Sequence, residues 1–167
     1  MFCLKLFVRD EYHSYEREVN AYAYLNQRGV KRCIPLVYYR RAWPRWRWDG
    51  AQPDDYNEHD RDEILYGIVM EFFEDCQEID MRKADIRTAQ VLAQSLERIH
   101  EALVVHRDIE ERNILVLREA GKQRIVFIDF SSAWLGFAFK PTRSLEWNEF
   151  RAFLYENIVH LQYIYAE

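Results

Sequence analysis

Three polar residues lie in short loops between apolar segments, where active-site residues are often found. Asp108 and Asn113 stand five residues apart in a break between the apolar residues 103–105 and 114–116. Asp129 follows sixteen residues after Asn113, directly behind another apolar segment. A carboxylate can orient and deprotonate a hydroxyl, and carboxylate and amide oxygens bind magnesium. Phosphoryl transfer to a hydroxyl needs both kinds of group.

The residues around them resemble the catalytic core of the protein-kinase superfamily. Residues 106–113 read HRDIEERN and Asp129 begins the triplet DFS, which resemble the HRDxxxxN and DFG motifs. The resemblance implies that Asp108 is the catalytic base and that Asn113 and Asp129 are magnesium ligands. Turn-capping by Asp and Asn between strands is the alternative. It accounts for either residue alone but not for their joint spacing. His100, ahead of this loop, is interpreted as a packing histidine.

Lys5 lies in the apolar segment 2–6, which resembles the VAIK strand of the same superfamily. The resemblance implies that Lys5 contacts the α- and β-phosphates of ATP and pairs with a helix glutamate. A helical wheel favours Glu18 over Glu16 as this partner, because Glu18 projects inside the expected buried arc. That arc is defined by Tyr15, Val19, Tyr22 and Leu25. The alternatives are a lysine on an exposed strand face and a snorkelling surface glutamate.

The segment 69–73, Val-Met-Glu-Phe-Phe, resembles the hinge that binds adenine through its backbone. The resemblance implies that Met70 is the gatekeeper and that Glu71 and Phe73 contribute to nucleotide binding. An apolar strand that ends in a glutamate is common, so a plain strand end remains the alternative.

Two positions depart from the protein-kinase pattern. Protein kinases usually carry a lysine two residues after the base, where this chain has Glu110. That lysine helps to hold the transferred phosphate, so its replacement weakens the expectation of a protein substrate. Small-molecule phosphotransferases of the aminoglycoside and choline type vary at this point, and Arg112 is the candidate to supply a positive charge. Ser131 replaces the glycine of the DFG triplet, which removes easy access to positive φ.

The elements that must position these residues follow from apolar periodicity and turn residues. Helical spacing predicts helices over 11–28, which Gly29 ends, over 86–103 with Asp85 as N-cap, and over 146–165. Strands are predicted at 2–8, 34–39, 64–73, 114–117 and 124–130, with a hairpin turn at 119–122. Residues 49–63 and 76–84 are expected to be loops. The chain is therefore of the α+β class.

The resemblance implies one partial protein-kinase-like domain over 1–167 with a two-lobed fold. Residues 1–73 are expected to form the remnant of the N-lobe, with its helix and hinge, and 74–167 a shortened C-lobe. Only four residues precede Lys5, and the five glycines form no GxGxxG. We therefore expect an N-lobe that lacks the glycine-rich loop, is truncated before its third strand, and exposes the strand of Lys5 as a sheet edge.

Composition restricts the class of protein. The chain is 49% hydrophobic and 16% aromatic, which is typical of a globular protein. Its net charge of −5 argues against nucleic-acid binding. Cys3, Cys33 and Cys76 are widely spaced without a metal-binding pattern, which favours reduced thiols. Neither a signal region nor a membrane-spanning segment is visible, so we expect a cytoplasmic protein that does not bind a membrane.

The segment 41–48 interleaves arginine and tryptophan. Such a segment can stack on a protein partner. The alternative is a half-buried hairpin arm whose tryptophans pack on the N-lobe and whose arginines face the acidic residues 49–63.

Taken with these residues, the resemblance implies magnesium-dependent transfer of the ATP γ-phosphate to a hydroxyl, on a protein Ser/Thr or on a small molecule. The pattern is similar to that of short fungal-type protein-kinase-like proteins. A pseudokinase or partner-binding module, or a fragment of a longer kinase, is the alternative, with weak or no catalysis.

Overall fold

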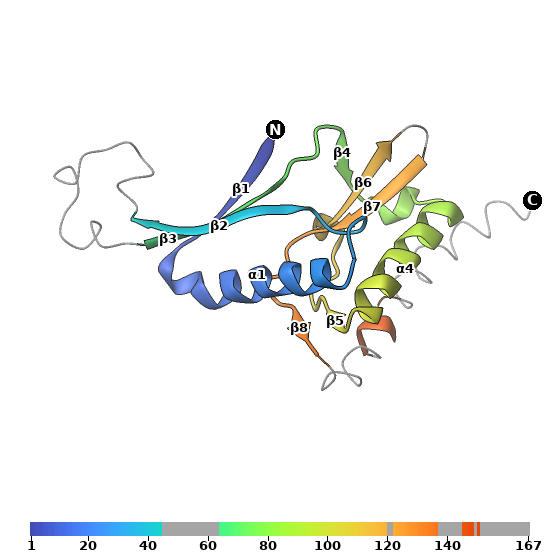
Figure 1. Cartoon of the computed structure of the whole chain (residues 1–167). Coiled ribbons are helices and arrows are strands. Elements are labelled where there is room, and N and C mark those ends of the chain that lie inside the picture. The colour runs from blue at the N-terminus through green and yellow to red at the C-terminus, as the bar shows by residue number, and fades with distance from the viewer. Residues whose placement is uncertain (45–63, 120–121, 137–144, 149, 151–167) are drawn as a thin grey trace, which may run out of the picture.

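The computed structural model describes residues 1–44, 64–119, 122–136, 145–148 and 150. Over these residues the chain is a mixed α+β structure with three small antiparallel sheets (Figure 1). The α-helices are α1 (Tyr12–Gln27) and α4 (Ile86–Glu101), and the 3-10 helices are η1 (Arg9–Glu11), η3 (Met81–Lys83) and η4 (Glu111–Asn113). The strands are β1 (Phe2–Phe7), β2 (Val37–Pro44), β3 (Ile64–Glu71), β4 (Cys76–Glu78), β5 (Val104–Val105), β6 (Ile114–Glu119), β7 (Lys122–Phe127) and β8 (Trp134–Leu135).

The first sheet has the order β1-β3-β2, so β1 lies at its edge as expected. Helix α1 lies along this sheet in Figure 1. Aromatic packing holds the two together, since the Tyr15 ring lies 5.6 Å from that of Phe7 and 5.2 Å from that of Tyr66. These contacts place the buried side of α1 against the strand that carries Lys5.

Gly29 ends α1, as predicted. Its φ of 77° lies in the left-handed region that glycine adopts without strain. The turn is closed by the Val30 amide, which donates to the carbonyl of Leu25 at 3.0 Å. The chain then reverses, and Cys33 and Ile34 enter the core.

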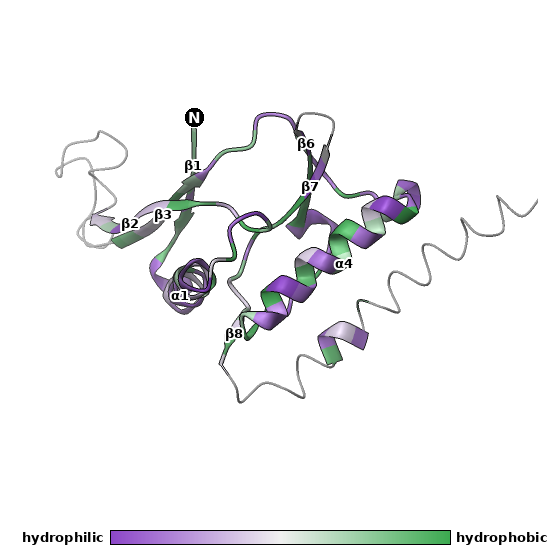
Figure 2. Ribbon diagram, turned by 45° about the vertical axis from the view of Figure 1, so that its right-hand side comes forward, coloured by the Kyte–Doolittle hydropathy of each residue, from purple (hydrophilic) through white to green (hydrophobic). Residues whose placement is uncertain are grey.

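Helix α4 begins at the predicted N-cap. The Asp85 carboxylate accepts a hydrogen bond from the Thr88 amide at 2.7 Å. The amphipathic pattern of this helix is visible in Figure 2, where green and purple alternate along its length. Its buried side includes Leu92, Leu96 and Ile99 and packs against β7 and β5.

The second sheet is built on the hairpin of β6 and β7, in which Ile114 pairs with Phe127. β4 joins the other side of β6, and the short strands β5 and β8 form the third sheet. This arrangement places residues 106–113 in the connection between β5 and β6. It places Asp129 just past the end of β7.

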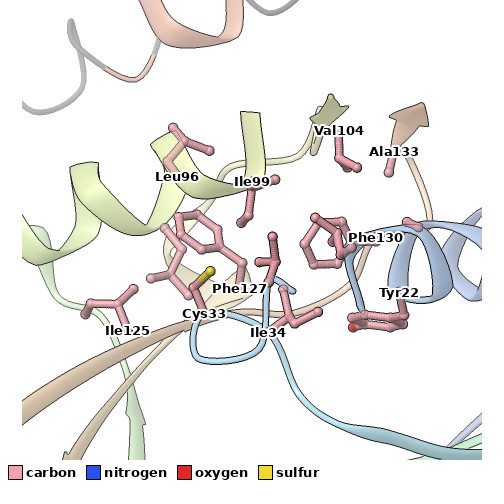
Figure 3. Packing of buried hydrophobic residues seen from close by; sticks show 14 of the residues in the cluster. Tyr22, Cys33, Ile34, Leu96, Ile99, Val104, Ile125, Phe127, Phe130 and Ala133 are labelled. Atoms are coloured by element: carbon pink, nitrogen blue, oxygen red, sulfur yellow. The ribbon is translucent and has the colours of Figure 1, made fainter. Parts of the chain in front are cut away.

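One continuous core joins the first sheet and α1 to α4 and the hairpin. Figure 3 shows Tyr22 of α1 beside Phe130, with ring centroids 5.2 Å apart. Cys33, Ile99 and Phe127 belong to the same cluster, and the Phe127 amide donates to the Cys33 carbonyl at 2.9 Å. The core therefore fixes where β1 lies relative to the end of β7.

Three predicted boundaries were wrong. The strand expected at 34–39 runs from Val37 to Pro44, because Ile34 turns into the core. Residues 76–84, expected as a loop, contain β4 and η3. The strand expected to reach 130 ends at Phe127, because Asp129 adopts a φ of 61° that no strand allows.

Two further expectations fall partly outside the described residues. Of the Arg/Trp segment 41–48, residues 41–44 belong to β2, which pairs with β3 as one arm of an antiparallel pair. Residues 45–48, the acidic residues 49–63 and the part of the predicted last helix beyond 150 lie outside the described residues. None of the described helices is both long enough and apolar enough to cross a membrane.

Candidate active site

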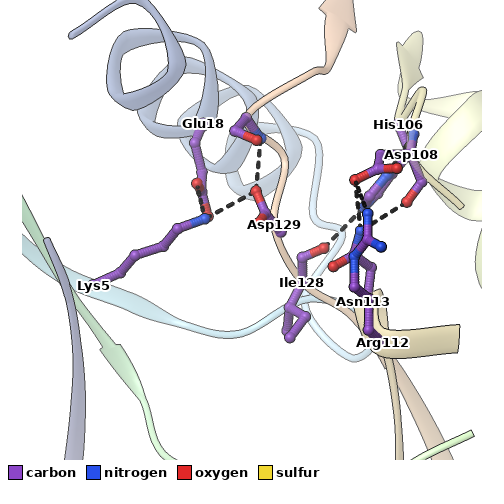
Figure 4. A network of polar contacts seen from close by, with 9 residues as sticks. Lys5, Glu18, His106, Asp108, Arg112, Asn113, Ile128 and Asp129 are labelled. Carbon is purple, nitrogen blue, oxygen red and sulfur yellow. Dashed lines mark hydrogen bonds and ion pairs between the residues drawn. The ribbon is translucent and has the colours of Figure 1, made fainter. Parts of the chain in front are cut away.

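Lys5 stands at the centre of a cluster of charges drawn from three elements. Its Nζ lies 2.6 Å from Oε2 of Glu18 on α1 and 2.9 Å from Oδ1 of Asp129 after β7. Figure 4 shows the lysine extending from β1 between the two carboxylates. The ion pair with Glu18, which the helical wheel predicted, is thus present.

Burial and charge act against one another in this cluster. Glu18 is fully buried, and this burial raises the pKa of Glu18 although Lys5 counteracts it. Burial alone lowers the pKa of Lys5, but the charges and hydrogen bonds of Glu18 and Asp129 raise that pKa overall. Burial works against a charged Asp129 too, yet hydrogen bonds from Ser131 and Lys5 lower the pKa of Asp129. Lys5 and Asp129 are therefore held in their charged forms.

The backbone at Asp129 directs its carboxylate. Asp129 is one of three non-glycine residues with positive φ in the described chain, and such residues are costly unless their surroundings hold them. The Ser131 amide donates to Asp129 Oδ1 at 3.3 Å. Ser131 itself is not among the positive-φ residues, so the missing glycine causes no backbone strain there.

Asp108 and Asn113 meet across their loop. The Asn113 side-chain amide nitrogen donates to the carbonyl and to Oδ2 of Asp108, each at 2.9 Å. This use of the nitrogen leaves the amide oxygen of Asn113 as the atom that can bind a metal. Arg112 lies 3.5 Å from Asp108 Oδ2 and forms an ion pair with Glu110, so its charge is shared.

His106 connects this loop to the segment of Asp129. Its Nε2 donates to the Ile128 carbonyl at 2.9 Å, and its Nδ1 accepts from the Asp108 amide at 3.3 Å. A ring with one donor and one acceptor nitrogen is neutral. Burial lowers the pKa of His106, which agrees with this state. The ring also packs on Phe130, 4.4 Å between centroids.

The Glu146 side chain holds the backbone of the loop at 106–113. Sequence analysis did not identify Glu146 as a residue of the site. Its buried carboxylate accepts hydrogen bonds from the backbone amides of His106, at 3.2 Å, and of Arg107. It also lies 2.6 Å from Nε2 of His100, so that histidine packs against a partner as expected. The only signal in the sequence was an acidic residue between the apolar Leu145 and Trp147.

Arg107 adopts the second unusual backbone conformation of the site, with a φ of 67°. Its guanidinium lies over the ring of Trp134 in β8 at 3.8 Å. The loop is therefore held on one side by Glu146 and on the other by β8.

The sequence matches the lipopolysaccharide kinase (Kdo/WaaP) family over residues 68–162, which is more than half of the chain. The chain belongs to this family. The family is part of the protein-kinase-like superfamily, so the resemblance found in the sequence is confirmed. The matched region contains Asp108, Asn113 and Asp129, while Lys5 and Glu18 precede it. No curated protein matched the sequence.

In this member of the lipopolysaccharide kinase family, the predicted hinge begins at the end of β3, the strand that pairs with β1, where Met70 lies opposite Cys3. Met70 is buried in the core. The Glu71 carboxylate accepts from the Leu36 amide at 3.1 Å and pairs with Arg124 at 3.4 Å. The Phe73 carbonyl accepts from the Cys76 thiol at 3.3 Å. Among the described residues, none of the three hinge residues forms a hydrogen bond or ion pair with Lys5, Asp108 or Asp129.

Asn113 and Asp129 carry oxygen atoms of the kind that bind magnesium together with substrate phosphates. Within the described part of the chain, no three His, Cys, Asp or Glu side chains gather as a metal site. Magnesium needs no such cluster, because it is commonly bound by one or two protein groups together with substrate phosphates and water. Asn113 and Asp129 supply one amide oxygen and one carboxylate.

Proposed function

We propose that this protein is an ATP- and magnesium-dependent phosphotransferase that transfers the γ-phosphate to a hydroxyl group. Family membership supports kinase chemistry at the level of the family. The observation that most supports the finer statement is the position of Lys5, whose Nζ lies between the carboxylates of Glu18 and Asp129 at 2.6 and 2.9 Å. A cation held in this way beside a candidate metal ligand suits a triphosphate.

Each residue of the site then has a role. Asn113 and Asp129 would hold magnesium, which neutralises phosphate charge. Lys5 would contact the α- and β-phosphates while Glu18 keeps it in place. Asp108 would take the proton of the acceptor hydroxyl, whose oxygen bonds to the γ-phosphorus as the bond to ADP breaks. Arg112 stays a candidate for binding the acceptor or the transferred phosphate.

We also infer a two-lobed arrangement. Residues 1–73 would form the N-lobe and 74–167 the C-lobe, with ATP bound between them. Met70, Glu71 and Phe73 would lie on the adenine side. Because the Glu71 side chain is occupied by Leu36 and Arg124, and its backbone amide donates to the Leu36 carbonyl at 2.8 Å, we expect any adenine contact there to come from other backbone groups of the hinge.

For the acceptor, we propose the hydroxyl of a saccharide. The name of the family states that its members are lipopolysaccharide kinases. Glu110, in the position where protein kinases carry a lysine, pairs with Arg112, so this loop offers a mixed pair of charges instead of a lone cation.

Binding of Mg-ATP tests the proposal directly. Titration calorimetry should detect binding by the wild type, and Asp129→Asn should weaken it at least ~10-fold by removing a charged ligand. Asp75→Asn is the matched control, because Asp75 is exposed and outside the site. Excess EDTA should mimic Asp129→Asn. Absence of Mg-ATP binding by the wild type would overturn the proposed function.

A second candidate is a partner-binding pseudokinase. The ion pair between Arg112 and Glu110 favours this candidate. Because Glu110 neutralises Arg112, the positive charge beside Asp108 is less able to hold the transferred phosphate. Turnover of ATP with saccharide acceptors separates the two candidates. A phosphotransferase should lose about 10²–10⁴-fold of its rate in Asp108→Asn, whereas a pseudokinase should show weak or no turnover, which Asp108→Asn leaves unchanged.

A further inference from the structure

Tyr22 carries a buried hydroxyl that the proposed chemistry does not use. The residue lies on α1, four positions after Glu18, and is 2% exposed. Its ring packs edge-on against Phe130, which directly follows Asp129 (Figure 3). An apolar side chain could fill the same place in the core, so this packing does not account for the hydroxyl.

The hydroxyl is one of two buried side-chain polar atoms that make no hydrogen bond of good geometry within the described residues, although it lies close enough to interact with Glu18 and with the backbone of Asp129. The other is Oε1 of Glu18. Buried polar atoms are almost always paired, and each unpaired one is destabilising. Residues four apart on a helix share one face, so these two atoms lie along the same buried side of α1.

The two atoms are chemically complementary. A phenol can donate a hydrogen bond, and a carboxylate oxygen only accepts. Burial, followed by the charge of Glu18, raises the pKa of Tyr22 well above its usual value, so the phenol keeps its proton. Lys5 hydrogen-bonds to Oε2 of Glu18, which leaves Oε1 available. The terminal torsion of a glutamate is soft, so a small rotation can join the two atoms.

We propose that Tyr22 is a positioning residue for the Lys5–Glu18 ion pair. In the nucleotide-bound protein its hydroxyl donates to Glu18 Oε1, and this fixes the carboxylate that directs Lys5 toward the phosphates. The same side chain packs against Phe130, so one residue joins α1 to the segment that carries Asp129. This role rests on the proposed function, because it acts through Lys5.

A double-mutant cycle tests this role. Affinity for Mg-ATP is measured by calorimetry for the wild type, Tyr22→Phe, Glu18→Met and the double variant, because methionine is similar in length to glutamate and lacks an oxygen that could accept from Tyr22. Tyr22→Phe keeps the ring and should weaken Mg-ATP binding about 10-fold, the effect of one hydrogen bond to a charged group. In the Glu18→Met background, the same change should alter affinity by less than about 2-fold, because Tyr22 acts through the Glu18 carboxylate.

Two comparisons make the outcome decisive. Tyr24→Phe, a half-buried tyrosine on the same helix, should leave affinity unchanged. Tyr22→Leu also lacks the hydroxyl and should show the same dependence on Glu18. An equal loss from Tyr22→Phe in both backgrounds would mean that Tyr22 only packs, and it would overturn the positioning role alone. Wild-type protein that does not bind Mg-ATP would overturn the proposed function and this role together.

Discussion

The charged cluster at Lys5 and the loop at 106–113 lie side by side in Figure 4 but are built in opposite ways. The cluster joins Lys5, Glu18 and Asp129, which come from three elements and are far apart in the sequence. The main contact of the loop joins Asp108 to Asn113, only five residues away. The cluster therefore depends on packing of the whole core, whereas the loop depends first on local geometry.

The two regions also differ in how their charges meet solvent. Glu18 is fully buried, so loss of its partner would leave a charge without solvation. Arg112 is 60% exposed, so solvent screens its ion pairs with Glu110 and Asp108. Among the described residues, Glu146 is the buried carboxylate that the loop contacts. The effects of substitutions should therefore follow burial and not closeness to Asp108.

Glu146→Ala should have the largest effect on stability. It leaves the amides of His106 and Arg107 and the His100 ring without their acceptor. Breaking a buried network of this kind costs about 3–5 kcal/mol. Urea denaturation should show the loss, while Glu97→Ala, an exposed change on α4, should stay within about 0.5 kcal/mol. A loss below about 1 kcal/mol would show that the loop holds its shape locally.

Lys5→Met should have the next largest effect, and that effect should depend on pH. The substitution leaves Glu18 buried without its cation, which we expect to cost about 2–4 kcal/mol at pH 7, reduced because Lys5 is 29% exposed. Burial raises the folded-state pKa of Glu18. Burial favours the neutral form of Glu18. The contribution of this form to the free energy of unfolding is therefore present at low pH and is lost as the pH rises through the raised pKa.

The difference between Lys5→Met and the wild type should thus be small near pH 4 and large at pH 7. Denaturation curves at both values measure it, and Lys31→Met, on an exposed lysine, is the control. A difference that does not change with pH would contradict the assignment of Glu18 as the buried charge.

Arg112→Ala should have the smallest effect on stability. Its ion pairs are exposed, so removal should change the free energy of unfolding by no more than about 0.5 kcal/mol. High salt should reduce even this difference. Thermal denaturation of both proteins at low and high salt gives the measurement. A loss of unfolding free energy as large as that of Lys5→Met would mean that Arg112 stabilises the fold and that its ion pairs are not weak exposed pairs.

Local patterns predicted the elements that are fixed by neighbouring residues. The N-cap at Asp85, the end of α1 at Gly29 and the hairpin of β6 and β7 each depend on a few adjacent side chains or turn residues. The wheel also placed Glu18 correctly, because the apolar face of α1 is a local pattern. The predicted beginning of β2 was wrong, because the start of this strand depends on how Ile34 enters a core formed by distant residues.

The sequence by itself determined the types and spacing of Asp108, Asn113 and Asp129, and through them the kinase-like ancestry that the family match confirms. Only the tertiary structure decided what holds those residues in place. The ion pairs that Lys5 makes with Glu18 and Asp129 and the support from Glu146 arise from contacts between separate elements. Such contacts leave no local pattern, because burial and pairing are set by the packing of the complete core.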